Sequence, residues 1–212
     1  IMNLHTFEKA EHAPIRRSLQ DNSHNVSTSF PTGFLIPISW VDVCPASTFR
    51  GQLGGFSRMG LTPLKPVMDR AYTDSYAFYV PYRILWKGFV KVYGEGEPTE
   101  WDTPTESTVP YFDPSTPGLS GMFKKYSIFD YLGYNVDDTS SRKLSILPIL
   151  AYVRVWEDFF RDANLQSKNP GTSVLYEAAS GSDQSNNLIT LLMYMDNLSS
   201  TLITTKLYKL NR

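Results

Sequence analysis

Three histidines are the side chains best suited to bind a metal ion, and they lie near the N-terminus as His5, His12 and His24. A zinc site needs three or four ligands held in tetrahedral geometry. His5 and His12 are seven residues apart in a polar segment that offers no rigid frame. The single cysteine, Cys44, excludes a Cys-based zinc site and an internal disulfide. We therefore expect no metal site and no cofactor, and histidines that contact solvent or a partner molecule.

The sequence also lacks the usual motifs of catalysis. The glycine-rich run at residues 51–55 has no following Lys-Ser/Thr and no helix to hold a phosphate, so it fits neither a P-loop nor a dinucleotide site. Residues 94–120 are rich in proline and acids, but paired carboxylates for glycoside hydrolysis need fixed separations of about 5–10 Å. No G-x-S-x-G motif occurs, and Cys44 follows an apolar run, which predicts a buried, inert thiol. We expect no enzyme, with catalysis or cation binding by the acidic loop as the weaker alternative.

Composition favours β structure with long loops. The 212 residues are 42% hydrophobic and 14% aromatic, and only 19% are charged, below the usual ~25%. Many prolines and glycines accompany the aromatics, whereas a helical bundle needs Ala, Glu, Lys and Leu. The net charge of −1 gives no general attraction to nucleic acid. No apolar stretch is long enough to cross a membrane, and we expect no membrane partner.

Periodicity predicts the elements along the chain. Residues 1–30 are expected to form an extended arm that cannot order itself alone. Alternating patterns predict strands at 34–43, 47–59 and 70–80. Spacings of three and four predict helices at 82–93 and 148–163, and a short helix runs from Ser127 to Gly133. On the longer helix, Arg154–Asp158 and Glu157–Arg161 are expected to form ion pairs. Residues 188–198 are ambiguous, and 201–210 could form a strand.

Charge is distributed unevenly despite the small total. Residues 50–91 hold seven bases and two acids, whereas residues 94–120 hold acids and no Lys or Arg. Basic residues mixed with Tyr72, Trp86 and Tyr93 could contact single-stranded nucleic acid by phosphate pairing and base stacking. Salt bridges between subunits, or plain solvation, are equally compatible with this pattern.

Several segments together resemble the major capsid protein of the Microviridae, small single-stranded DNA phages, and especially its gokushovirus branch. The matches occur in family order over about residues 2–166. They are HAPIRRSLQDNSHNVSTSFPTGFLIPI, VCPASTFRG, PVMDRAYTDSYAFYVPYRILWKGF, YSIFDYLGY and LPILAYVRVWEDFFRDANLQ. The sequence departs from the family pattern at Ala46, where Gly is usual, and at Leu150, where Arg is usual.

The resemblance implies a mainly β fold, the viral jelly-roll antiparallel β-sandwich with long inserted loops and a few short helices. The arm would cover residues 1–30 and the capsid domain residues 31–212, with the acidic loop at 94–120 inserted and 169–212 carrying no family motif. Such a protein assembles from identical subunits into an icosahedral shell around circular single-stranded DNA. Its location would be the virion, after assembly in the cytoplasm of a host bacterium. Other virion or scaffolding proteins are further expected partners.

The implied function directs attention to two sets of residues. Candidates for DNA contact are Lys9, Arg16 and Arg17 in the arm and, more loosely, Arg50 and Arg58. Candidates for contacts between subunits are Trp40, Tyr82, Trp86 and Trp156. A carbohydrate- or receptor-binding β-sandwich module of a phage is the alternative function, suggested by the aromatic residues and the acidic loop.

Overall fold

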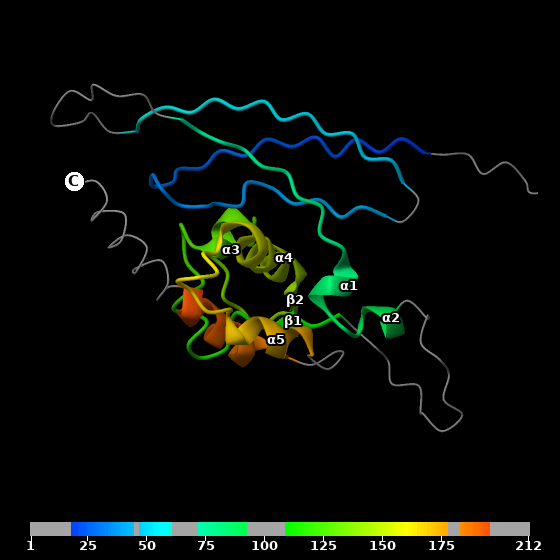
Figure 1. Ribbon diagram of the computed structural model, residues 1–212, viewed down its shortest axis with the longest axis vertical. Coiled ribbons are helices and arrows are strands. Elements are labelled where there is room, and N and C mark those ends of the chain that lie inside the picture. The colour runs from blue at the N-terminus through cyan, green and yellow to red at the C-terminus, as the bar shows by residue number, and fades with distance from the viewer. Residues whose placement is uncertain (1–17, 45–46, 61–71, 93–108, 178–182, 196–212) are drawn as a thin grey trace, which may run out of the picture.

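The computed structural model describes residues 18–44, 47–60, 72–92, 109–177 and 183–195. Figure 1 shows a helical body with a layer of extended chain along one side of it. In chain order the elements are α1 (Tyr82–Leu85), α2 (Phe89–Val92), β1 (Tyr111–Phe112), α3 (Ile128–Tyr131), β2 (Leu144–Ser145), α4 (Leu147–Val155), the π-helix η1 (Trp156–Phe160) and α5 (Pro170–Tyr176). Residues 185–195 are also helical.

The predicted jelly-roll β-sandwich is wrong for the described residues. Their sheet consists of β1 and β2 alone, which pair antiparallel with Phe112 opposite Leu144. The chain over residues 34–43, 47–59 and 72–80 is not helical, as predicted, but joins no ladder. Between described residues of 18–60 and 72–80, the backbone makes one hydrogen bond to itself, from Ser47 N to Cys44 O. Alternation favours an extended conformation, but a strand also needs a hydrogen-bonded neighbour.

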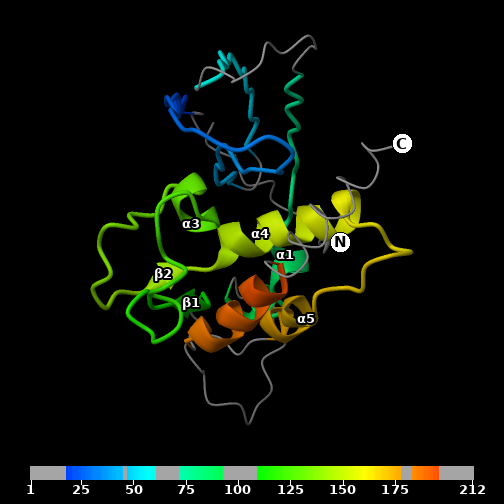
Figure 2. The ribbon, with the colours of Figure 1, turned by 90° about the vertical axis from the view of Figure 1, so that its left-hand side faces the viewer.

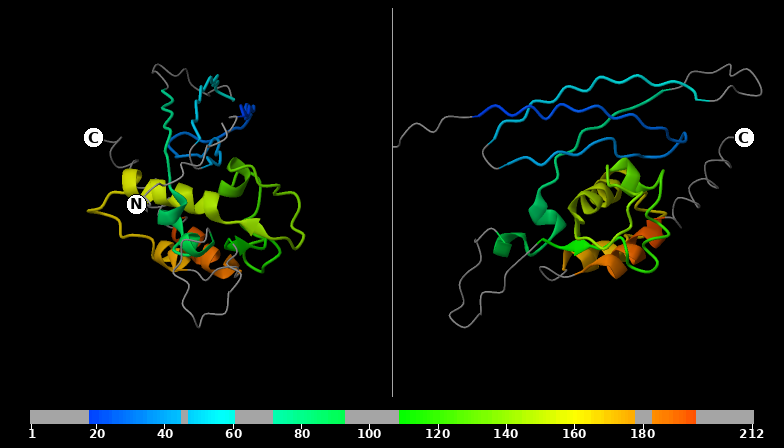
Figure 3. Two further views of the ribbon diagram at one scale, coloured as in Figure 1. Left: turned by 90° about the vertical axis from the view of Figure 1, so that its right-hand side faces the viewer. Right: turned by 180° about the vertical axis from the view of Figure 1, so that it is seen from behind.

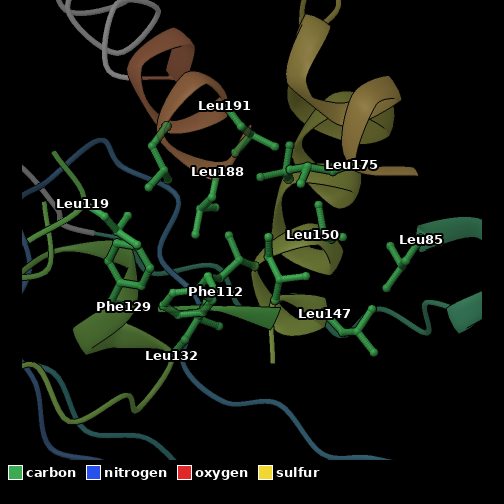
Figure 4. Close-up of a cluster of buried hydrophobic side chains, with 14 of the residues drawn as sticks. Leu85, Phe112, Leu119, Phe129, Leu132, Leu147, Leu150, Leu175, Leu188 and Leu191 are labelled. Atoms are coloured by element: carbon green, nitrogen blue, oxygen red, sulfur yellow. The ribbon is translucent and has the colours of Figure 1, made fainter. Parts of the chain in front are cut away.

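The core of the helical body forms around α4. The predicted stripe is confirmed at Ile149, Val153 and Trp156, which are buried, and Pro148 lies in the first turn, where its missing N–H costs nothing. Figure 4 shows how leucines of α4, α5 and residues 185–195 converge on Phe112 and Phe129. The buried cluster is Leu85, Trp86, Phe112, Leu119, Phe123, Phe129, Leu132, Val136, Ile146, Leu147, Ile149, Leu150, Val153, Leu175, Leu188, Leu191 and Leu192.

The end of the long helix widens into η1. Arg154 and Asp158 form the predicted pair at 2.8 Å, but Glu157 is buried and bonds to residues outside its own helix. A π-helix has i→i+5 hydrogen bonds, so residues four apart no longer stack as they do in an α-helix. Arg161 has already left the helix for an extended conformation. The predicted Glu157–Arg161 pair is therefore replaced by a contact with the next helix.

The predicted helix at 82–93 is divided into α1 and α2. Trp86 has an extended backbone between them, and its side chain is 1% exposed. A Cβ placed on Gly88 would lie 2.4 Å from the Trp86 ring, so only glycine leaves room for the indole at this break. Burial of a large aromatic side chain thus outweighs continuation of one short helix.

The short helix α3 follows its sequence signals. Ser127 is the N-cap residue, and Gly133 closes the end with a φ of 85°, a conformation that favours glycine. Phe129 of α3 packs against Phe123 with ring centroids 4.9 Å apart. Beside it, the Tyr134 hydroxyl donates a 2.7 Å hydrogen bond to Ser145 O, and burial raises the pKa of Tyr134. The aromatic core therefore fixes β2 relative to α3.

Candidate assembly surface

We define the extended layer as residues 18–44, 47–60 and 72–80. Figures 1 and 3 show these segments on the side of the body where α3 and α4 lie. Its exposed large apolar side chains are Leu19, Val26, Phe30, Phe34, Ile38, Trp40, Val41, Val43, Phe49, Leu53, Phe56, Met59, Tyr72, Tyr76, Phe78 and Tyr79. Large exposed apolar regions mark interaction sites, and unpaired extended backbone favours association with another chain.

Three hydrogen bonds tie the layer to the helical body. The Tyr152 hydroxyl donates to Leu35 O at 2.8 Å, and the Tyr131 hydroxyl donates to Ser29 O at 3.1 Å. In the opposite direction, Trp40 Nε1 donates to Leu132 O at 2.9 Å. Burial raises the pKa of Tyr152 to about 12, so its hydroxyl keeps the donated proton near neutral pH. Each tie joins an aromatic side chain to a backbone carbonyl.

A fourth contact joins residues 72–80 to η1 through aromatic rings. Phe78 lies 4.9 Å from Phe159 and 6.1 Å from Phe160, measured between ring centroids, and Tyr76 lies 5.8 Å from Phe160. All four side chains remain exposed. The π-helical turn thus presents Phe159 and Phe160 outward, where they extend the apolar surface of the layer onto the body.

The two sets of predicted residues fall in different places. Lys9, Arg16 and Arg17 lie outside the described residues. Arg50 and Arg58 are exposed on the extended layer, and the described part of the chain provides neither with an ion pair. Between them, Phe56 is 91% exposed. Cationic and aromatic side chains therefore alternate along residues 49–58.

The predicted interface residues divide by burial. Trp40 is 46% exposed, and Tyr82 is half-buried against the core. Trp86 and Trp156 are 1% and 9% exposed, so they stabilise the subunit and present little surface to a neighbour. Cys44 was predicted to be buried, but its residue is exposed because residues 34–44 lie in the extended layer.

Glu157 is a buried residue whose role the sequence did not reveal. It is 7% exposed, and its Oε1 accepts hydrogen bonds from Asn169 N at 3.0 Å and from Thr172 Oγ1 at 2.9 Å. Asn169 caps α5 by accepting from Gly171 N and also donates to Leu191 O. This Glu157 network connects η1, α5 and residues 185–195. The N-cap pattern Asn-Pro-Gly at 169–171 was the available signal for α5.

Two further properties concern ligands and membranes. No set of three or more His, Cys, Asp or Glu side chains within the described ranges is placed to hold a metal ion. The helices seen in those ranges are all too short or too polar to cross a bilayer.

Comparison with known proteins identifies the family. The model of the capsid protein (F protein) family matches residues 9–207, which extends beyond the motifs recognised in the sequence. Capsid protein VP1 of Chlamydia phage 1 is 33% identical over 165 residues, covering 77% of this chain and 27% of that protein. The corresponding protein of Bdellovibrio phage phiMH2K is 31% identical over 166 residues, covering 78% and 30%. That of Spiroplasma virus 4 is 33% identical over 165 residues, covering 78% and 29%.

The chain spans less than a third of the length of these relatives. No solved structure matches it. The family match nonetheless covers most of the 212 residues, and the relatives are all capsid proteins of gokushovirus-type Microviridae. The chain belongs to the capsid protein (F protein) family of these phages.

Proposed function

We propose that this chain acts as a structural major capsid protein, which assembles with identical copies into an icosahedral shell around a circular single-stranded DNA genome. The extended layer is the observation that carries the proposal. A subunit that keeps this much apolar side chain and unpaired backbone at its surface gains stability when neighbours cover it. Its site of action is the virion, with assembly in the bacterial cytoplasm, and scaffolding proteins are compatible partners.

Self-association of the purified chain tests this function. We expect sedimentation to show concentration-dependent assembly, and electron microscopy to show shells or shell fragments. Replacing Phe49 and Phe56 with serine should weaken assembly because both side chains lie exposed in the layer. Val174→Ser is the matched control, since Val174 is exposed on α5 of the helical body. A monomer at every concentration, for the unaltered chain, would contradict the proposal.

Contact with the genome is the second part of the proposal. Arg50 and Arg58 lack acidic partners within the described residues and lie beside exposed phenylalanines, which is the combination that binds single strands without sequence preference. Lys9, Arg16 and Arg17 are proposed to act with them from the arm. Replacing Arg50 and Arg58 with alanine should lower affinity for an oligothymidine and reduce the salt dependence by about one to two phosphate contacts.

Lys168→Ala provides the control for this measurement because Lys168 is exposed on the body, away from the layer. An unchanged salt slope in the double arginine variant would remove these two residues from the proposed DNA contact. Glycan binding by small oligomers, without shells, would instead favour the alternative of a receptor-binding module.

A further inference from the structure

A hollow lies between the two halves of the first extended segment. A turn at Thr32 and Gly33, where Gly33 has a φ of 86°, reverses the chain so that residues 20–24 face residues 39–42. Figure 2 shows this segment, in blue, folded back on itself beside α3. The hollow has a volume of about 500 Å³ and opens to solvent, a size typical of small-ligand sites. Its lining is Gln20, Asn22, Ser23, His24, Trp40, Val41 and Asp42.

His24 holds the two halves at this separation. Its Nε2 lies 2.6 Å from Ser39 Oγ on the opposite half, and its Nδ1 lies 3.0 Å from Asn22 O. Both ring nitrogens therefore have partners within the segment itself. His24 acts as a spacer that keeps the hollow open, and it leaves ligand contacts to the other lining residues.

Trp40 provides a fixed aromatic surface in the hollow. Its Nε1–H is already bonded to Leu132 O at 2.9 Å, which attaches the edge of the indole to the helical body. The residue nevertheless remains 46% exposed and lines the hollow. Because the ring is held before any ligand arrives, stacking against it costs little side-chain entropy.

Polar groups with free hydrogen-bonding capacity surround this surface. Within the described residues, no side-chain partner is recorded for the amides of Gln20 and Asn22 or for the carboxylate of Asp42. Amides both donate and accept, and a carboxylate accepts up to four hydrogen bonds. Neighbouring hydroxyl groups of one small ligand could therefore be bonded by three side chains.

The charge of the lining decides between two classes of ligand. No Lys or Arg lines the hollow, and Asp42 is its carboxylate. Asp21, next to the lining, keeps its negative charge because hydrogen bonds from Ser23 lower its pKa. Phosphate groups would be repelled here, which disfavours a nucleotide even though Trp40 could stack on a base. A ligand with an apolar ring face and several neutral hydroxyl groups matches every group in the hollow.

We propose that this hollow binds one neutral pyranose unit of a glycan, with the C–H face of the sugar ring on Trp40 and its hydroxyl groups on Asp42, Gln20 and Asn22. This inference is independent of shell assembly. It assigns to the capsid protein a saccharide site on the first extended segment, where the sequence showed only a polar run around a single tryptophan.

Ligand-observed saturation-transfer NMR of the full chain tests the site. The probes are glucose, galactose, mannose and N-acetylglucosamine, with thymidine monophosphate as the anionic arm. We expect a signal from at least one neutral sugar and none from the nucleotide. Trp40→Ala and Asp42→Asn should each weaken sugar binding by about tenfold or more, because one removes the stacking surface and the other a charged acceptor.

Two controls separate loss of the site from loss of the fold. Phe56→Ala removes an exposed aromatic ring outside the hollow and should leave binding unchanged. Asp42→Asn alters an exposed side chain, so circular dichroism should match the unaltered chain. Absence of sugar binding in the unaltered chain, binding that survives both hollow variants, or preferential binding of thymidine monophosphate would each overturn the proposal.

Discussion

The hydroxyl of Tyr152, in the middle of α4, donates a 2.8 Å hydrogen bond to the backbone oxygen of Leu35, which lies 117 residues earlier in the chain. This bond connects the most buried helix of the body to the extended layer. Together with the Tyr131 and Trp40 ties, it determines which side of the layer faces the helices and which side stays free. The apolar surface available for assembly is therefore set by a few aromatic side chains of the body and the layer.

Removing the Tyr152 hydroxyl should loosen the layer while the body stays folded. Tyr152→Phe leaves Leu35 O without its partner, and we expect a loss of about 1 kcal/mol in unfolding free energy. Hydrogen exchange should accelerate around residues 34–36 and stay unchanged in α5. Tyr126→Phe is the control because Tyr126 is exposed. Equal exchange in both variants would show that the tie has no role in holding the layer.

The Glu157 network should be among the most sensitive parts of the helical body. Glu157→Ala leaves the buried Asn169 N–H and the Thr172 hydroxyl without their acceptor, and we expect a loss of about 2–4 kcal/mol. Glu157→Gln keeps one acceptor oxygen and should recover part of this loss. Chemical denaturation measures the difference. Asp158→Ala is the adjacent control, since its exposed pair with Arg154 contributes at most about 0.5 kcal/mol.

Two glycines should respond oppositely to the same substitution. A Cβ on Gly171 would lie 2.8 Å from Leu191 Cβ, so Gly171→Ala should push α5 away from residues 185–195 and cost about 1–3 kcal/mol. The nearest atom to a Cβ on Gly121 is 3.9 Å away. Gly121→Ala should therefore be neutral or stabilising by up to about 1 kcal/mol. Similar thermal midpoints for the two variants would rule out the close approach at Gly171.

Acid should weaken the turn after β1 through Asp113. Hydrogen bonds from the Ser141 hydroxyl and from Ser115 lower the pKa of Asp113 from 3.8 to about 2. A lowered pKa in the folded state contributes stability that is present above pH 3.8 and is lost as the pH falls through about 2. We expect a declining melting temperature over this interval, and a flatter profile in Asp113→Asn. Asp74→Asn, at an exposed position, should leave the profile of the unaltered chain.

Local signals in the sequence were sufficient for several helices. Ser127 and Gly133 delimit α3, and the apolar stripe with Pro148 locates α4, because these signals act within one or two turns. The family resemblance also identified the capsid protein correctly. By contrast, the break at Trp86 depends on burial of one indole, and the change to η1 redirects Glu157 toward α5.

The prediction of a β-sandwich failed for a different reason. Alternation along residues 34–43 and 72–80 correctly excluded helix, but no local signal specifies which segment a strand pairs with. The ties to Ser29 and Leu35 were also beyond prediction, because a backbone oxygen has no signature in the sequence. Half of the candidate surface could be anticipated from its aromatic residues, and its attachment to the body could not.

The attachment by Tyr131 and Tyr152 has a consequence for how this surface can evolve. Both hydroxyls recognise main-chain oxygens, which every amino acid carries. Positions 29 and 35 can therefore change side chain without releasing the segment, whereas the two tyrosines cannot be exchanged freely. A virus built this way can vary the residues shown along the segment while the path of the chain remains constant.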